Sequence, residues 1–87
     1  FIKKTMSYFV YVIGSLKHSK PKTYVGWTKN LSERLRKHNL GKGAKSTKGR
    51  NWRIIYREIY NSKKKAMTRE YYLKKDRNLR NKLRKKI

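Results

Sequence analysis

The stretch YFVYVI, residues 8–13, constrains the fold of this chain more than any other segment. Aromatic and β-branched residues fill it, which is typical of a β-strand. Side chains alternate between the two faces of a strand, and here both alternating sets are apolar or aromatic. The odd-numbered set is Phe9, Tyr11 and Ile13. Because both faces need to be covered, we expect this strand at the centre of its sheet.

A second strand and a capped helix are predicted next. Residues 14–22 contain glycine, serine and proline, which predict a loop, and TYVGW, residues 23–27, predicts a strand. The short connection favours antiparallel pairing with the first strand. Asn30 is a suitable helix N-cap, and Glu33 completes a capping-box pattern. Gly41 is placed to end this helix after about Asn39.

The second half of the chain predicts one more strand and two helices. We expect a mobile, basic, glycine-rich loop over residues 41–51, GKGAKSTKGRN. Residues 52–60 favour a strand, because β-branched and aromatic residues dominate there. Ser62 is expected to cap a helix over residues 63–75, and Asp76 a last helix.

The predicted fold class is α+β, with a small three-stranded, mostly antiparallel sheet flanked by helices in the order β-β-α-β-α-α. The length of 87 residues predicts one domain, residues 1–87, in which residues 1–6 are interpreted as an extension that could be disordered.

The charge of the chain predicts a polyanionic partner. It has 27 Lys and Arg against 4 Asp and Glu, a net charge of +23. Nucleic acid is the leading candidate, because phosphate contacts need no particular base; a ribosomal RNA site, an acidic membrane surface and plain solubility stay open on charge alone. The absence of cysteine excludes disulfides and thiolate metal sites. No apolar run approaches the roughly 20 residues of a membrane span, so we expect an intracellular protein of the cytoplasm or nucleoid.

An ordered series of motifs runs through the chain. FVY, residues 9–11, and YVG, residues 24–26, lie in the first two predicted strands, and TKNLSERLRKHN, GKGAKSTKGRNW and AMTREYYLKK follow. This series resembles the GIY-YIG nuclease superfamily, especially its small single-domain bacterial members and the nuclease domain of structure-specific junction-resolving endonucleases. Phe9 stands in place of the glycine of the first motif. An asparagine found late in some members has Asn78 and Asn81 as its candidates here.

The resemblance implies a DNA endonuclease that hydrolyses phosphodiester bonds with a single divalent cation, Mg²⁺ or Mn²⁺. The implied catalytic residues are Tyr11, Tyr24, Arg34, His38 and Glu70. Glu70 would bind the metal, and Arg34 would grip the scissile phosphate. Tyr24 would act as general base or orient the attacking water, assisted by Tyr11, and His38 would take or relay a proton. A free phenol has a pKa of about 10, so a tyrosine base needs cations nearby that lower its pKa.

Ordinary structural roles compete with these catalytic ones. Taken alone, Tyr11 is more typical of a core aromatic residue. Glu70 is expected on the packed face of its helix, where it would pair with Lys74 at i+4 if it held no metal. Trp27 and Trp52 could stack on unpaired bases, although core packing is favoured for both.

Several basic residues are expected to follow the phosphate backbone of DNA. They are Lys42, Lys45, Lys48, Arg50, Lys63, Lys64 and Lys65. The expected substrate is branched, flapped or nicked duplex DNA, selected by its shape or through a targeting protein partner. The alternative function is a non-catalytic, basic nucleic-acid-binding protein associated with the ribosome or nucleoid. A polybasic membrane-surface protein is poorly supported, because no predicted helix combines bulky apolar and basic faces.

Overall fold

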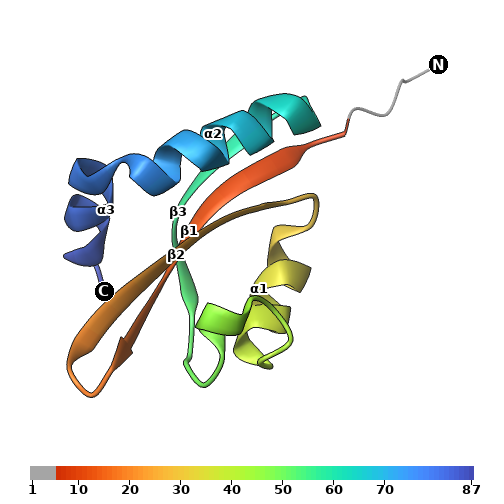
Figure 1. Cartoon of the computed structure of the whole chain (residues 1–87). Coiled ribbons are helices and arrows are strands. Elements are labelled where there is room, and N and C mark those ends of the chain that lie inside the picture. Colours follow the sequence, from red (N-terminus) through yellow and green to blue (C-terminus); the bar gives the residue numbers. More distant parts are fainter. Residues whose placement is uncertain (1–5) are drawn as a thin grey trace.

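The computed structural model describes residues 6–87. The chain folds into a three-stranded antiparallel sheet with helices on both faces (Figure 1). Its elements are β1 (Tyr8–Lys17), β2 (Lys20–Thr28), α1 (Leu31–Asn39), the 3₁₀ turn η1 (Lys45–Thr47), β3 (Arg53–Tyr60), α2 (Lys63–Lys75) and α3 (Arg77–Arg84). The predicted α+β class and the order β-β-α-β-α-α are confirmed. Of the predicted N-terminal extension, residues 1–5 lie outside the described residues, and Met6 is exposed ahead of β1.

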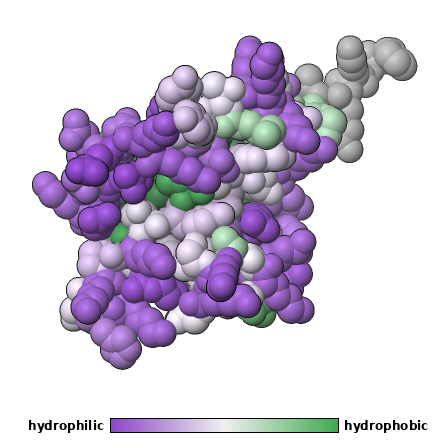
Figure 2. Space-filling view, viewed as in Figure 1, coloured by the Kyte–Doolittle hydropathy of each residue, from purple (hydrophilic) through white to green (hydrophobic). Residues whose placement is uncertain are grey.

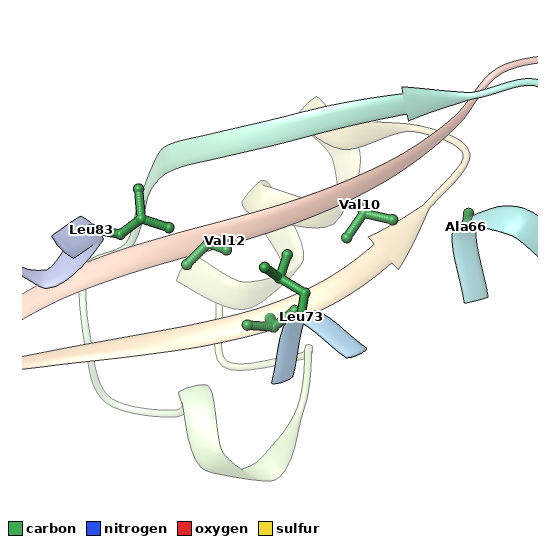
Figure 3. Close-up of a cluster of buried hydrophobic side chains, with 6 residues drawn as sticks. Val10, Val12, Ala66, Leu73 and Leu83 are labelled. Atoms are coloured by element: carbon green, nitrogen blue, oxygen red, sulfur yellow. The ribbon is translucent and has the colours of Figure 1, made fainter. Parts of the chain in front are cut away.

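Strand β1 is central, as its two apolar faces predict. The strand order is β2-β1-β3, and β1 pairs antiparallel with both neighbours. One face of β1 packs under α2 and α3 in a core that Figure 3 shows. Its buried members are Val10, Val12, Val25, Ala66, Leu73 and Leu83. The opposite face packs against α1 and the chain before β3, with the buried members Tyr11, Ile13, Leu31 and Trp52.

The loop predicted over residues 14–22 is wrong, because β1 and β2 continue through most of it. Only His18 and Ser19 lie outside the two strands, and both have positive φ angles, 52° and 62°. A two-residue turn of this kind matches the twist of the strands that it joins. The sequence lacks the Asn-Gly or Gly-rich pair that usually marks such a turn. Pro21, which favoured a loop, is tolerated because β2 is an edge strand.

The helix caps follow the local rules of the sequence, with one exception. The side chains of Asn30, Ser62 and Asp76 each accept a backbone hydrogen bond at the start of α1, α2 and α3. The capping box at α1 is only half formed: the Glu33 carboxylate pairs with Arg36 at 2.7 Å, while the Asn30 N–H donates to the Thr28 hydroxyl at 3.2 Å. Arg36 therefore competes with the Asn30 N–H for the Glu33 carboxylate.

The glycine-rich loop after α1 is held more firmly than its composition suggests. Gly41 adopts a φ of 74° just after the end of α1, as predicted. Further along, Lys22 Nζ donates to the Ser46 carbonyl and Lys17 Nζ to the Gly49 carbonyl, each at 2.8 Å. The indole N–H of Trp52 donates to the Thr47 carbonyl at 2.8 Å, and Trp52 is buried. The loop is thus a packed part of the face that carries α1.

The surface agrees with the high charge of the chain. Hydrophilic residues cover most of the face that Figure 2 shows, and hydrophobic residues form only small patches on it. Within residues 6–87, the helices are too short and too polar for any of them to cross a membrane.

Candidate active site

Four of the five predicted catalytic residues meet on the face of the sheet that carries α1. Tyr11 comes from β1, Tyr24 from β2, and Arg34 and His38 from α1. Tyr11 stands opposite Gly26 in the β1–β2 register. A Cβ at Gly26 would lie 2.5 Å from the Tyr11 hydroxyl, so the missing side chain makes room for the phenol. This explains why a glycine is needed inside β2, where it otherwise weakens a strand.

The Tyr11 hydroxyl is the centre of a hydrogen-bonded group. It lies 2.8 Å from Nε2 of His38 and accepts a longer hydrogen bond of 3.4 Å from Nε of Arg34. The Tyr24 ring packs beside His38, with 4.9 Å between the ring centroids. Tyr11 and His38 are almost fully buried, whereas Tyr24 and Arg34 are half-buried and reach the surface of the site.

The second nitrogen of His38 also has a partner. Nδ1 lies 2.9 Å from the hydroxyl of Thr47, and that hydroxyl donates to the carbonyl of Ala44 at 2.8 Å. Gly43 packs directly against the imidazole, where a Cβ would clash with Nδ1. Both ring nitrogens are therefore satisfied by protein groups, as a buried histidine requires.

Burial controls the protonation of this group. Desolvation raises the pKa of Tyr11 to about 12, against the opposing effect of Arg34, so the phenol stays protonated at neutral pH. The positive charge of Arg34 lies close to Tyr11, but the effect of burial on the pKa of Tyr11 is larger. Desolvation, and then the charge of Arg34, lowers the pKa of His38, which keeps the imidazole neutral. The hydrogen bond with Tyr11 raises the pKa of Arg34, and Tyr24 adds to this effect.

Glu70 lies on α2, which packs on the other face of the sheet. Its negative charge is the smallest of the causes that raise the pKa of Tyr11. Within residues 6–87 it makes no hydrogen bond or ion pair with the other four site residues; its Oε1 lies 3.3 Å from Nζ of Lys74. The Lys74 pairing expected for a carboxylate without metal is thus present. The side chain of Glu70 is 20% exposed, so solvent reaches it.

The predicted DNA-binding residues fall into two groups on opposite faces of the sheet (Figure 1). The first group follows α1 in the glycine-rich loop, and its lysines are exposed; Arg50 is half-buried and donates to the Ser15 carbonyl at 3.3 Å. The second group forms the exposed first turn of α2 and comprises Lys63, Lys64 and Lys65. A single stretch of DNA that contacts both groups has to pass around the sheet.

Sequence reasoning missed Thr47 and Gly43 as parts of the site. The loop that contains them was interpreted as a phosphate-binding segment, with its lysines as the important residues. A usable signal was present: His38 lies on the apolar stripe of α1, where burial is expected, and a buried imidazole needs partners for both nitrogens. The nearby loop offers a hydroxyl at Thr47.

Comparison with known proteins identifies the family. A family model described as the GIY-YIG catalytic domain matches residues 7–84, nearly the whole chain. The chain belongs to the GIY-YIG family. The GIY-YIG domain is of nuclease type, which makes nucleic acid the class of substrate. The paired tyrosines on β1 and β2 are the residues through which the sequence resembles this family.

Small bacterial proteins are similar to this GIY-YIG chain over most of its length. A UPF0213 protein of Clostridium perfringens is 44% identical over 68 residues, which cover 77% of this chain and 70% of the relative. A UPF0213 protein of Staphylococcus aureus is 42% identical over 69 residues, which cover 78% of this chain and 80% of the relative. A UPF0213 protein of Bacillus halodurans, solved by solution NMR, is 36% identical in sequence. The match covers 90% of this chain and 82% of the Bacillus halodurans chain, with a TM-score of 0.49.

Proposed function

We propose that this GIY-YIG domain is a metal-dependent DNA endonuclease that hydrolyses phosphodiester bonds and selects DNA by shape rather than by sequence. The observation that carries the proposal is the convergence of side chains from three elements: Tyr11, Arg34 and His38 form one hydrogen-bonded group, and the Tyr24 ring packs beside His38. Nucleic-acid binding does not by itself require a buried phenol–imidazole pair beside a guanidinium. Basic side chains alone would be sufficient for binding.

Glu70 is the residue that would hold a divalent cation. Within residues 6–87 no three His, Asp or Glu side chains cluster as a metal site, so the protein would supply one carboxylate. Mg²⁺ and Mn²⁺ fit such a donor, since Mg²⁺ in particular binds through one or two carboxylates and fills its remaining positions with water and substrate phosphate. Lys74, which pairs with Oε1 of Glu70, would have to move away to leave this carboxylate free for a cation. When bound, it would stabilise the charge that develops on the phosphoryl oxygens.

The other four residues would divide binding and proton transfer between them. Arg34 uses Nε for Tyr11, which leaves its two terminal nitrogens to grip the scissile phosphate. Tyr24, the more exposed phenol, would orient or deprotonate the attacking water. Tyr11 is buried and protonated, so it would pass a proton inward to the neutral imidazole of His38.

Selection by shape follows from how such a chain would contact DNA. A net charge of +23 attracts the phosphates of any sequence, and phosphate contacts position DNA without reading its bases. The two lysine groups lie on opposite faces of the sheet, so together they suit a bent, branched, flapped or nicked duplex. Intracellular DNA of this kind, brought to the enzyme directly or by a targeting protein, is the proposed substrate.

Cleavage of labelled DNA tests the proposal. Flapped, nicked, four-way and fully paired duplexes are incubated with the protein and Mg²⁺, with EDTA as one control. Glu70→Gln should slow incision by at least about 100-fold, the scale of losing one element of transition-state charge stabilisation. Glu33→Gln is the matched variant, because its carboxylate pairs with Arg36 on the exposed side of α1. It should cut like the wild type.

Binding is measured in parallel by gel shift in EDTA, where all variants should bind. Binding of every substrate without incision by the wild type in Mg²⁺ or Mn²⁺ would refute the nuclease proposal and favour a nucleic-acid-binding protein. Equal incision of paired and branched DNA would refute the proposed selection by shape.

A further inference from the structure

We propose that Thr47 is a positioning residue of this site: its hydroxyl fixes the tautomer of His38 so that Nε2 is free to accept the proton of Tyr11. The tautomer is a property of the folded protein alone. Its importance for catalysis rests on the nuclease function proposed above.

The direction of each hydrogen bond follows from the donors that are available. The Ala44 carbonyl can only accept, and we assign to it the single proton of the Thr47 hydroxyl across 2.8 Å. With that assignment, the same oxygen acts as an acceptor toward His38, 2.9 Å away, and Nδ1 carries the hydrogen. In a neutral imidazole this leaves Nε2 as the acceptor. The hydroxyl of Tyr11, at 2.8 Å, therefore donates to Nε2.

Packing keeps this arrangement in place. His38 and Thr47 have no exposed surface, so water has no access to either partner. The backbone of Thr47 is held by the indole N–H of Trp52 at 2.8 Å. Gly43 packs against the edge of the imidazole that carries Nδ1. Thr47 therefore sits ready in the folded protein and needs no substrate to bring it into position.

The opposite tautomer would stop proton transfer from Tyr11. With hydrogen on Nε2, the imidazole would donate to the Tyr11 hydroxyl, which already accepts from Arg34. The phenol proton would then have no acceptor among these groups. In the proposed tautomer, the Tyr11 hydroxyl gives its own proton to Nε2 as it takes one released in the site, so the phenol stays neutral and His38 becomes an imidazolium. The bond from Nδ1–H to Thr47 persists in both states.

Two substitutions at Thr47 test the role of the hydroxyl separately from the role of side-chain shape. Thr47→Val keeps the volume and removes the acceptor, whereas Thr47→Ser keeps the hydroxyl and removes a methyl group. The ¹⁵N chemical shifts of the His38 ring, measured by NMR on the labelled full chain at neutral pH, report which nitrogen carries the hydrogen. Wild type and Thr47→Ser should show hydrogen on Nδ1. Thr47→Val should shift the population toward hydrogen on Nε2 and should slow incision by about 10- to 100-fold, the scale expected when a buried group loses its hydrogen-bond partner.

The outcomes distinguish this inference from the proposed function. Hydrogen on Nε2 in the wild type would overturn the inference without any variant, so it stays testable even if Thr47→Val fails to fold. Unchanged ring shifts in a folded Thr47→Val protein would overturn it too, as would a Thr47→Ser protein that behaves like the valine variant. If the shifts change as expected while no protein cuts DNA, the positioning role of Thr47 is supported and the nuclease proposal fails.

Discussion

Replacing Glu58 with glutamine is expected to destabilise the protein strongly at neutral pH. The Glu58 carboxylate on β3 accepts hydrogen bonds from Tyr56, from Tyr60 at 2.6 Å, and from Arg69 of α2 at 2.8 and 3.0 Å. This group joins α2 to the sheet. Since Arg69 directly precedes Glu70, the same contacts help to fix the position of Glu70 on α2.

The magnitude follows from the pKa of Glu58. Burial disfavours the carboxylate, but the hydrogen bonds from Arg69 and the two tyrosines outweigh it and lower the pKa from 4.5 to about 2. The side chain is 18% exposed, so solvent screens the interaction only partly. At 1.36 kcal/mol per pKa unit, this difference corresponds to about 3 kcal/mol of folding stability. The loss in Glu58→Gln should be of the same order.

The lowered pKa of Glu58 determines how this stabilisation changes with pH. Because the pKa is lower in the folded state, the stabilisation is complete above pH 4.5 and is lost as the pH falls toward 2. Urea unfolding at pH 7, 5 and 3 should show a gap between wild type and Glu58→Gln that narrows to less than half at pH 3. Glu33→Gln is the control, since its exposed pair with Arg36 should contribute little at any pH. A gap that is absent at pH 7, or constant down to pH 3, would refute the reasoning.

Three further substitutions test other parts of the structure. Gly26→Ala should displace the Tyr11 ring, because a Cβ would lie 2.5 Å from its hydroxyl. We expect the free energy of unfolding in urea to fall by about 1–3 kcal/mol and incision activity to be lost, whereas wild-type stability would contradict the close packing. Replacing His18 and Ser19 with Asn-Gly should raise the melting temperature, since each positive φ costs of the order of 1 kcal/mol in a residue other than glycine; an unchanged value would argue against this turn. Leu83→Ala should lower the free energy of unfolding by about 2–5 kcal/mol, because Leu83 is 3% exposed in the α2–α3 core; a loss below 1 kcal/mol would show that α3 is not docked there.

The sequence determined the features that depend on neighbouring residues. The two apolar faces of residues 8–13 predicted a central strand, and Asn30, Ser62, Asp76 and Gly41 predicted the helix boundaries. These predictions were confirmed because alternation, capping and glycine turns act over a few residues of the chain. The candidate site residues came from the ordered motifs, whose resemblance to GIY-YIG nucleases agrees with the match of the family model to residues 7–84.

Only the tertiary structure decided which groups touch. The hydrogen bond between Tyr11 and His38 joins residues 27 positions apart, and no local pattern shows that the Tyr11 hydroxyl would occupy the space left at Gly26. Thr47 was missed for the same reason, and only the fold shows that Arg69 is the cation that pairs with Glu58. The length of the β1–β2 hairpin was also a tertiary outcome, because pairing with the central strand β1 extends β2 through Pro21 to Lys20. Local propensities act between chain neighbours, whereas burial and hydrogen-bond partners depend on residues that only folding brings together.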